Sequence, residues 1–160
     1  MNEYNDIDDF FSQYAARVNW ALWEGQFDAD GIMHSFTEDF VGASPLGVLA
    51  GKNDATFKEA ILRGWSYYRD LGIHSMNILR KSVTLLDGFH AMAKVNWQCL
   101  FVTKKGRSGE IDFEVIYILQ MRANTIKIFA YITGDELEAF KEAGLIDESA
   151  AEKRTFNTKV

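Results

Sequence analysis

The sequence contains one cysteine, one proline and three histidines among its 160 residues. A single cysteine has no partner within the chain, so no internal disulfide stabilises the fold. Cys99 lies between Trp97 and Phe101, which predicts a buried and inert thiol. The histidines and carboxylates do not show the spacing of a metal site, and we expect no cofactor. Pro45 lies in a short stretch that predicts a turn.

Positive charge is also scarce. The chain has 17 Lys and Arg against 23 Asp and Glu, which gives a net charge of −6. This balance argues against a nucleic-acid partner, which would need a basic surface. No apolar run approaches the roughly 20 residues that span a bilayer, and the polar N-terminal residues do not resemble a secretory signal. We therefore expect a cytoplasmic protein with no membrane partner.

Apolar and aromatic residues are abundant, at 48% and 14% of the chain. They alternate with polar residues over positions 74–133, which predicts four long antiparallel strands. Asp87-Gly88 and Ala123-Asn124 are typical of tight hairpin turns. A two-residue turn at Asp87-Gly88 would place Arg80 opposite Val95. The strands then share one apolar face with few polar groups, which is the strongest indication of a pocket.

Helical periodicity predicts helices over residues 6–23, 28–35 and 55–71, with a short hairpin at 38–50 before the third. A further helix follows the strands. Gly64 in the third helix predicts a close approach to another element, because glycine there costs about 1 kcal/mol relative to alanine. The separated helices and strands predict an α+β fold. We expect one domain over residues 1–146 and a polar tail over 147–160, either mobile or docked on a partner subunit.

Two short motifs and the order of the predicted elements resemble the nuclear transport factor 2-like superfamily. The motifs are Phe36-Thr37-Glu38-Asp39-Phe40 and, directly before the third helix, Gly51-Lys52-x-x-Ala55. This group includes SnoaL-like proteins, ketosteroid isomerases, scytalone dehydratases and the small subunits of ring-hydroxylating dioxygenases. The resemblance implies a cystatin-like, cone-shaped α+β barrel, in which a curved antiparallel sheet wraps a long N-terminal helix. It also implies a deep apolar pocket and frequent dimerisation through the convex face of the sheet.

The catalytic residues of the isomerases do not carry over to this chain. Ser44 stands where the resemblance implies a general-base aspartate, and a serine hydroxyl is no base without a partner. Val18 falls near the position of the donor tyrosine on the first helix. Tyr117 is the closest match to the oxyanion-donating aspartate and still offers a hydrogen bond. The chemistry of the ketosteroid isomerases is therefore not expected.

Arg80 has three interpretations. On the apolar face it either forms an ion pair at the rim or binds an anionic ligand group, because an unpaired buried charge is very costly. In the third interpretation the strand register slips and Arg80 lies outside. His34 and Tyr117 are candidate acid or base residues, although a lone histidine is more often structural. The candidate pocket residues are Arg80, Trp97, Tyr117, Tyr68, His34 and Phe36, and the aromatic ones have core packing as their alternative role.

The opposite face of the sheet mixes apolar and polar residues. We expect a homodimer through this face, formed by Ile116, Ile118, Phe129 and Tyr131.

Two functions remain open. One is a small-molecule pocket for an apolar or aromatic ligand, with dehydration, isomerisation or cyclisation as cofactor-free chemistry. The other is a non-catalytic accessory subunit, similar to a dioxygenase small subunit, with a packed interior.

Overall fold

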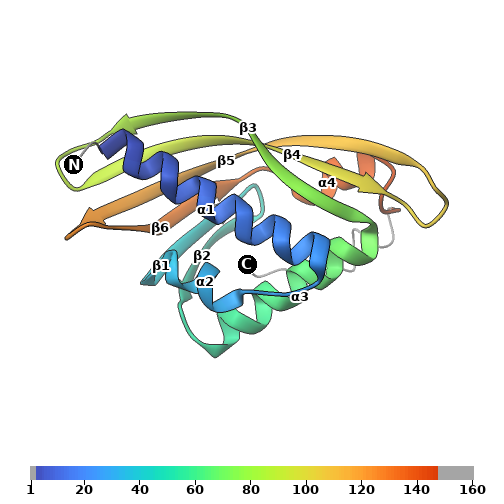
Figure 1. Ribbon diagram of the computed structural model, residues 1–160, viewed down its shortest axis with the longest axis horizontal. Helices are drawn as coiled ribbons and strands as arrows, with labels where there is room; N and C mark the ends of the chain where they lie inside the picture. Colours follow the sequence, from blue (N-terminus) through green and yellow to red (C-terminus); the bar gives the residue numbers. More distant parts are fainter. Residues whose placement is uncertain (1–2, 148–160) are drawn as a thin grey trace.

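The computed structural model describes residues 3–147. In this part of the chain a six-stranded sheet curves round the N-terminal helix, which confirms the predicted cone-shaped α+β fold (Figure 1). The polar tail predicted over residues 147–160 lies outside the described residues, except for Asp147. In chain order the elements are α1 (Glu3–Glu24), α2 (Ala29–His34), β1 (Phe36–Ser44), β2 (Gly47–Lys52), α3 (Ala55–Leu71), β3 (Ile73–Leu85), β4 (His90–Val102), β5 (Ser108–Arg122), β6 (Thr125–Thr133) and α4 (Glu136–Glu142).

The sheet has the order β2-β1-β6-β5-β4-β3, and one of its pairings differs from the prediction. The antiparallel strands of the prediction are present, but β1 runs parallel to β6. The small hairpin of β1 and β2 therefore extends the sheet instead of standing apart from it. Parallel neighbours are separated by long connections, and here β2, α3, β3, β4 and β5 lie between β1 and β6 in the chain.

Local sequence signals fix the helices. Asp28 caps α2 by accepting a hydrogen bond from the Gly31 amide at 2.9 Å, and Asp54 caps α3 through the Phe57 amide at 3.1 Å. Gly72 ends α3 with a left-handed φ of 92°. The bounds predicted for α3 are confirmed. Similarly, Asp135 caps α4 through the Glu138 amide.

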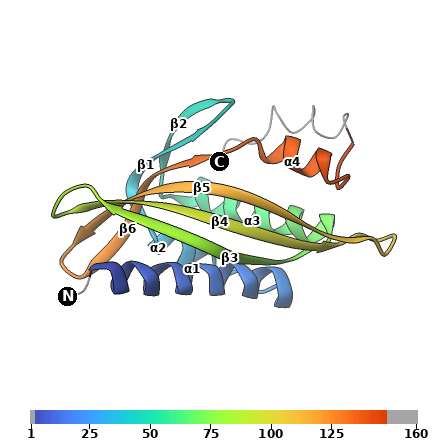
Figure 2. The same cartoon turned by 90° about the horizontal axis from the view of Figure 1, so that it is seen from above.

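Helix α1 covers the outer edge of β3, as Figure 2 shows. The Asn19 amide nitrogen donates to the Met76 carbonyl at 2.7 Å, and the Asn19 carbonyl accepts from the Met76 amide at 2.7 Å. One side chain thus satisfies both backbone groups of an edge residue. This pairing protects an edge that would otherwise be open to another strand.

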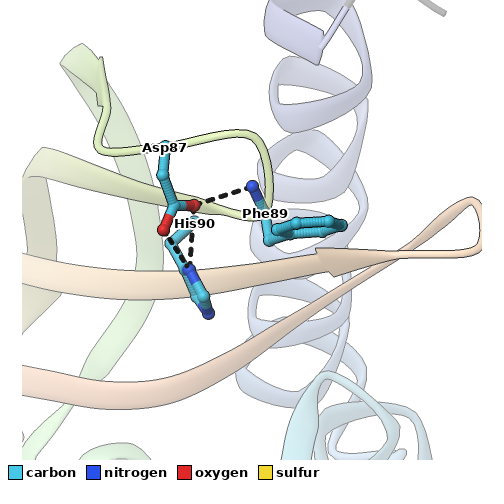
Figure 3. Close-up of polar contacts among 3 residues, drawn as sticks. All are labelled: Asp87, Phe89 and His90. Atoms are coloured by element: carbon cyan, nitrogen blue, oxygen red, sulfur yellow. Dashed lines mark hydrogen bonds and ion pairs between the residues drawn. The ribbon is translucent and has the colours of Figure 1, made fainter.

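The turn between β3 and β4 has a different geometry from the one predicted. The Asp87 carboxylate accepts from the Phe89 amide at 2.7 Å and lies 2.9 Å and 3.0 Å from His90 Nδ1 (Figure 3). Gly88 does not take a positive φ. The aspartate therefore closes a three-residue loop with its own side chain, and the predicted two-residue turn is wrong. The Ala123-Asn124 turn, with φ values of 48° and 64°, forms as predicted.

The longer loop is compensated by a bulge in β3. Ile78 pairs with Trp97 as predicted, but the register shifts between Ile78 and Arg80, so that Arg80 pairs with Asn96. Arg80 consequently lies on the outer face, where its Nε donates to Asn96 Oδ1 at 3.2 Å. Of the three interpretations of Arg80, the structure therefore agrees with the third, in which the strand register slips and Arg80 lies outside. Lys81 takes the inner position and pairs with Asp8 at 2.6 Å.

A second bulge, at Phe129 in β6, changes the face of the residues that follow it. The register between β5 and β6 shifts between Ile118 and Leu119. As a result Tyr131 packs inward against Phe36, with ring centroids 6.1 Å apart. The expectation that Tyr131 lies on the convex face is therefore wrong, because the extra residue breaks the two-residue alternation of the strand.

Asp87→Asn tests whether the aspartate holds the β3–β4 turn. Its hydrogen bonds with His90 and the Phe89 amide lower the pKa of Asp87 below the ordinary 3.8. The stabilisation is therefore present above that ordinary value and is lost as the pH falls through the lowered folded pKa. We expect the variant to melt slightly lower than the wild type at neutral pH and to lose this component of the acid dependence.

Calorimetry from neutral to acidic pH measures the effect. Asp112→Asn, an exposed carboxylate on β5, serves as the matched control. Identical pH profiles for Asp87→Asn and wild type would show that the turn does not depend on the carboxylate.

We expect replacement of glycine by alanine to have opposite effects on stability at two positions. A Cβ at Gly42 would lie 2.6 Å from the Tyr131 hydroxyl oxygen, whereas a Cβ at Gly64 meets no atom within 4 Å. The expected close approach at Gly64 is therefore wrong. We expect Gly42→Ala to destabilise the protein by about 1–3 kcal/mol through overpacking, and Gly64→Ala to stabilise it by roughly 0.4–1 kcal/mol. Urea unfolding measures both, and equal effects would contradict the packing argument.

Candidate functional site

Aromatic side chains fill the concave side of the sheet beneath α1. The ring centroids of Phe11 and Tyr117 lie 5.2 Å apart. The ring centroid of Tyr14 lies 6.2 Å from that of Trp97 and 6.2 Å from that of Tyr117. Trp97 is 1% exposed. Alternation along β4 and β5 and the 3.6-residue period of α1 bring these rings together, and such contacts add about 0.5–1.5 kcal/mol per pair beyond area burial.

A second aromatic group lies at the β1–β2 end of the cone. Phe40 and Phe57 have ring centroids 4.7 Å apart, and both Phe36 and Phe40 contact Tyr131. The absent Cβ of Gly42 leaves the space that the Tyr131 hydroxyl occupies. Tyr131 thus reaches the interior because of the bulge in its own strand and a glycine in the neighbouring one.

A buried hydrogen bond joins two of the candidate residues from the sequence. Trp97 Nε1 donates to the Tyr117 hydroxyl oxygen at 3.2 Å. Tyr117 acts as the acceptor in this bond, so its own hydroxyl hydrogen remains available to a second group. An accepted hydrogen bond also polarises a hydroxyl and makes it a better donor.

Three phenols face the same interior region. Burial raises the pKa of Tyr14, and the charge that Tyr131 would carry raises it further. Burial likewise raises the pKa of Tyr117, with Tyr14 and Tyr131 adding to the effect, and raises the pKa of Tyr131. The Tyr14 and Tyr131 hydroxyls form no hydrogen bond with another described residue. We call Tyr14, Tyr117 and Tyr131 the tyrosine cluster.

The cluster is chemically a set of neutral donors. Raised pKa values keep all three phenols protonated at neutral pH. The charged pair on this side of the sheet is Lys81 with Asp8, and Lys81 Nζ lies 5.9 Å from the Phe11 ring centroid. Those two charges neutralise each other. No carboxylate or imidazole is hydrogen-bonded to the cluster within the described part of the chain, so the site has donors but no general base.

The sequence-predicted site residues separate into two groups. Trp97 and Tyr117 come together beneath α1, whereas Phe36 belongs to the second aromatic group at the β1–β2 end. Arg80 does not, because its exposed side chain lies on the outer face. His34 ends α2 with an exposed side chain, and its carbonyl accepts from Lys127 Nζ at 2.6 Å. Tyr68 packs its ring against Phe140 of α4 at 5.8 Å.

Sequence reasoning missed Tyr14 and Tyr131 as site residues. Tyr14 lies in the apolar stripe of α1, one turn before Val18. A tyrosine in such a stripe needs a partner for its hydroxyl, and this signal was present in the sequence. Tyr131 had no comparable signal, because its inward orientation depends on the bulge at Phe129.

Cys99 also faces the interior and is 1% exposed. Burial raises its pKa to about 12, so the thiol stays protonated and unreactive. Within residues 3–147 no three His, Cys, Asp or Glu side chains are placed to hold a metal ion. No helix in this range combines the length and apolar character required to cross a membrane.

A groove opens on the outer side of the sheet where β1 diverges from β6. Phe36 pairs with Ile128 and Val41 with Ala130, so four residues of β1 face the single residue Phe129. The groove has a volume of about 710 Å³. We call it the outer groove, and it is lined by Phe36, Thr37, Glu38, Asp39, Asn53, Gln120, Lys127 and Phe129. The His90 ring of the turn in Figure 3 packs on Phe129, with centroids 5.8 Å apart.

Solved structures share this fold. An NTF2-like protein with a cystatin-like fold from Novosphingobium aromaticivorans is similar with a TM-score of 0.64 and 15% identity, over 97% of this chain and 89% of that chain. A ketosteroid isomerase-like protein from Erwinia carotovora atroseptica is similar with a TM-score of 0.62 and 18% identity, over 83% of this chain and 95% of that chain. An NTF2-like protein of unknown function from Shewanella oneidensis is similar with a TM-score of 0.57 and 16% identity, over 83% of this chain and 99% of that chain. At these identities the likeness concerns the fold alone.

The sequence matches no curated protein. It does match a family model, described as NTF2-like protein (DUF6841), over residues 2–136. The match spans both groups of aromatic residues and the outer groove, and the resemblance inferred from the sequence is confirmed. The chain belongs to this NTF2-like protein family.

Proposed function

We propose that the protein binds a small, mainly apolar molecule in the concave interior, and that the tyrosine cluster donates hydrogen bonds to an oxygen atom of that molecule. The observation that carries this proposal is the convergence of three neutral phenols in an aromatic interior. Two of them, Tyr14 and Tyr131, have no hydrogen-bond partner among the described residues. Both side chains are only half-buried, so water can reach their hydroxyls, and a ligand oxygen would replace that water.

The composition of the site defines the class of ligand. Aromatic rings on α1, β4, β5 and β6 favour a flat apolar body, because offset and edge contacts are available on several sides. The cation on this side of the sheet, Lys81, is already paired with Asp8, so the phenol donors favour a neutral acceptor such as a carbonyl, ether or phenol oxygen. A hydrogen bond in this low-dielectric setting is stronger than the same bond at the surface.

The proposal is one of binding and does not include general-base catalysis. Ser44 Oγ accepts from the Leu46 amide at 3.1 Å and so belongs to the β1–β2 turn. Val18 is buried and apolar. A catalytic pair of His34 and Tyr117 is not part of the proposal, because the first side chain is exposed and the second is buried.

Ligand titration of tyrosine variants tests this function. Quenching of tryptophan fluorescence by a panel of neutral aromatic ketones and phenols reports binding, and comparison with Trp97→Phe isolates the contribution of Trp97 among the four tryptophans. Trp97 contacts both Tyr14 and Tyr117. We expect Tyr14→Phe and Tyr117→Phe each to weaken binding up to about tenfold, the equivalent of one hydrogen bond of roughly 0.5–1.5 kcal/mol. Tyr4→Phe, an exposed tyrosine on the same helix, is the matched control.

The raised pKa values add a pH criterion. The phenols stay neutral donors below the ordinary tyrosine value of 10.0. Affinity should therefore be flat from about pH 6 to pH 9. Unchanged affinities in both tyrosine variants, or an affinity that titrates in this range, would sink the proposal.

A non-catalytic accessory subunit is the second candidate. It is favoured by the near-complete burial of Trp97 and by ring contacts that already occupy the interior. The same titration separates the two. Binding of no ligand in the panel, together with loss of stability in Tyr14→Phe and Tyr117→Phe, would favour a packed core.

We further propose a homodimer through the convex face of the sheet. Strand pairing places an apolar patch across four strands of this face, formed by Val41, Ala43, Val48, Ile116, Ile118, Ala130 and Ile132. Val48 is 71% exposed and Ile132 is 45% exposed. Exposed apolar side chains in one contiguous patch are typical of subunit interfaces. Phe129 lies beside the patch, whereas Tyr131 is no longer part of it.

Ile116→Lys tests the dimer. A charge in the centre of the patch would be desolvated on association, so we expect the variant to be monomeric at micromolar concentration while the wild type is dimeric. Ile116→Val is the matched control and should remain dimeric. Light scattering measures both, and a monomeric wild type would refute the interface.

A further inference from the structure

The outer groove has charges that are not matched within the described chain. Its lining contains two carboxylates, on Glu38 and Asp39, and one ammonium group, on Lys127. Asp39 is already neutralised by its ion pair with Lys52, which lies outside the lining. Glu38 lies within electrostatic range of the same Lys52 ammonium, so one positive charge faces two carboxylates. Neither Glu38 nor Lys127 forms an ion pair with another described residue. One net negative charge on the Glu38–Asp39 side and the positive charge of Lys127 therefore remain.

We propose that the outer groove is a binding site for a small zwitterion, of the class of free apolar α-amino acids. The ligand carboxylate would meet the Lys127 ammonium and the Gln120 amide, and the ligand ammonium would meet the Glu38 carboxylate. This site is distinct from the proposed ligand site in the concave interior, because it lies on the opposite side of the sheet and contains none of the three tyrosines. The two sites share only Phe36, whose ring also contacts Tyr131.

Lys127 is held in position before any ligand binds. Its Nζ donates to the His34 carbonyl at 2.6 Å, which leaves two further donor hydrogens on the ammonium group. A carbonyl partner fixes the position of this ammonium without neutralising its charge. The cation therefore needs less ordering when an anion arrives, which lowers the entropic cost of binding.

The apolar part of the ligand has a matching surface. The Phe129 side chain lies in the groove with the His90 ring against it, and Phe36 contributes to the lining. The volume of about 710 Å³ falls within the range of small-molecule sites and accommodates an amino acid of the size of leucine or phenylalanine. The aromatic surface favours apolar side chains over charged ones.

The exposure of the outer groove to solvent determines the affinity that we expect for the amino acid. Ion pairs at exposed positions contribute little each, so the affinity should be low, with a Kd on the order of 1 mM. Weak binding of this kind is measured by chemical-shift changes in ¹⁵N-labelled protein. L-leucine is the probe, and the amide signals of residues 37–39 and 127–129 are the expected reporters.

Blocked ligands test the role of each charge. We expect N-acetyl-leucine, which lacks the ammonium group, and leucinamide, which lacks the carboxylate, each to bind at least fivefold more weakly than leucine. Equal shifts from all three compounds, or no shift at 20-fold the expected Kd, would overturn the proposal.

Matched variants test the two residues. Glu38→Gln and Lys127→Met should each weaken leucine binding by at least fivefold, and Lys127→Arg should retain it because the charge is kept. Glu59→Gln and Lys104→Met, on exposed positions elsewhere, are the controls. Tyr14→Phe should leave leucine binding unchanged, so failure of this site and failure of the interior site are distinguishable.

Discussion

The irregular pairing of β6 around Phe129 is the constraint on which both candidate sites depend. In a regular strand Tyr131 would share the outer face with Phe129. The extra residue in β6 relative to β5 instead turns Tyr131 into the aromatic interior. The pairing with β1 is irregular at the same point, where the four residues 37–40 of β1 face Phe129 alone. The tyrosine cluster on one side of the sheet and the outer groove on the other therefore both lie at this irregular point.

The two sides of the sheet use different chemistry because they differ in solvent access. In the interior, burial keeps the phenols of Tyr14, Tyr117 and Tyr131 neutral, and the charged Lys81 is paired with Asp8. On the outer side, Glu38 and Lys127 remain charged because water solvates them. A neutral, oxygen-bearing ligand therefore suits the interior, and a zwitterion suits the outer groove. In both cases the solvent access of the side chains determines the class of ligand that suits the site.

The fold was predictable to a large extent. The caps at Asp28 and Asp54 and the glycine at position 72 are local signals, so the helices formed at the predicted positions. Trp97 and Tyr117 were assigned to one face by alternation alone, and they do share a hydrogen bond. The parallel pairing of β1 with β6 was not predictable in this way, since it joins segments about 90 residues apart and leaves no local pattern.

The sequence by itself determined the periodicities, and therefore which residues of each regular segment face the core. Only the tertiary structure decided the faces of Arg80 and Tyr131, because one additional residue in a strand reverses every later side chain. The bulge after Ile78 moves Arg80 out and Lys81 in, and the bulge at Phe129 moves Tyr131 in. Packing between distant segments favours these orientations. Lys81 forms an ion pair with Asp8 on α1, and the Tyr131 ring packs over Gly42 on β1. Neither contact joins residues that are near in sequence.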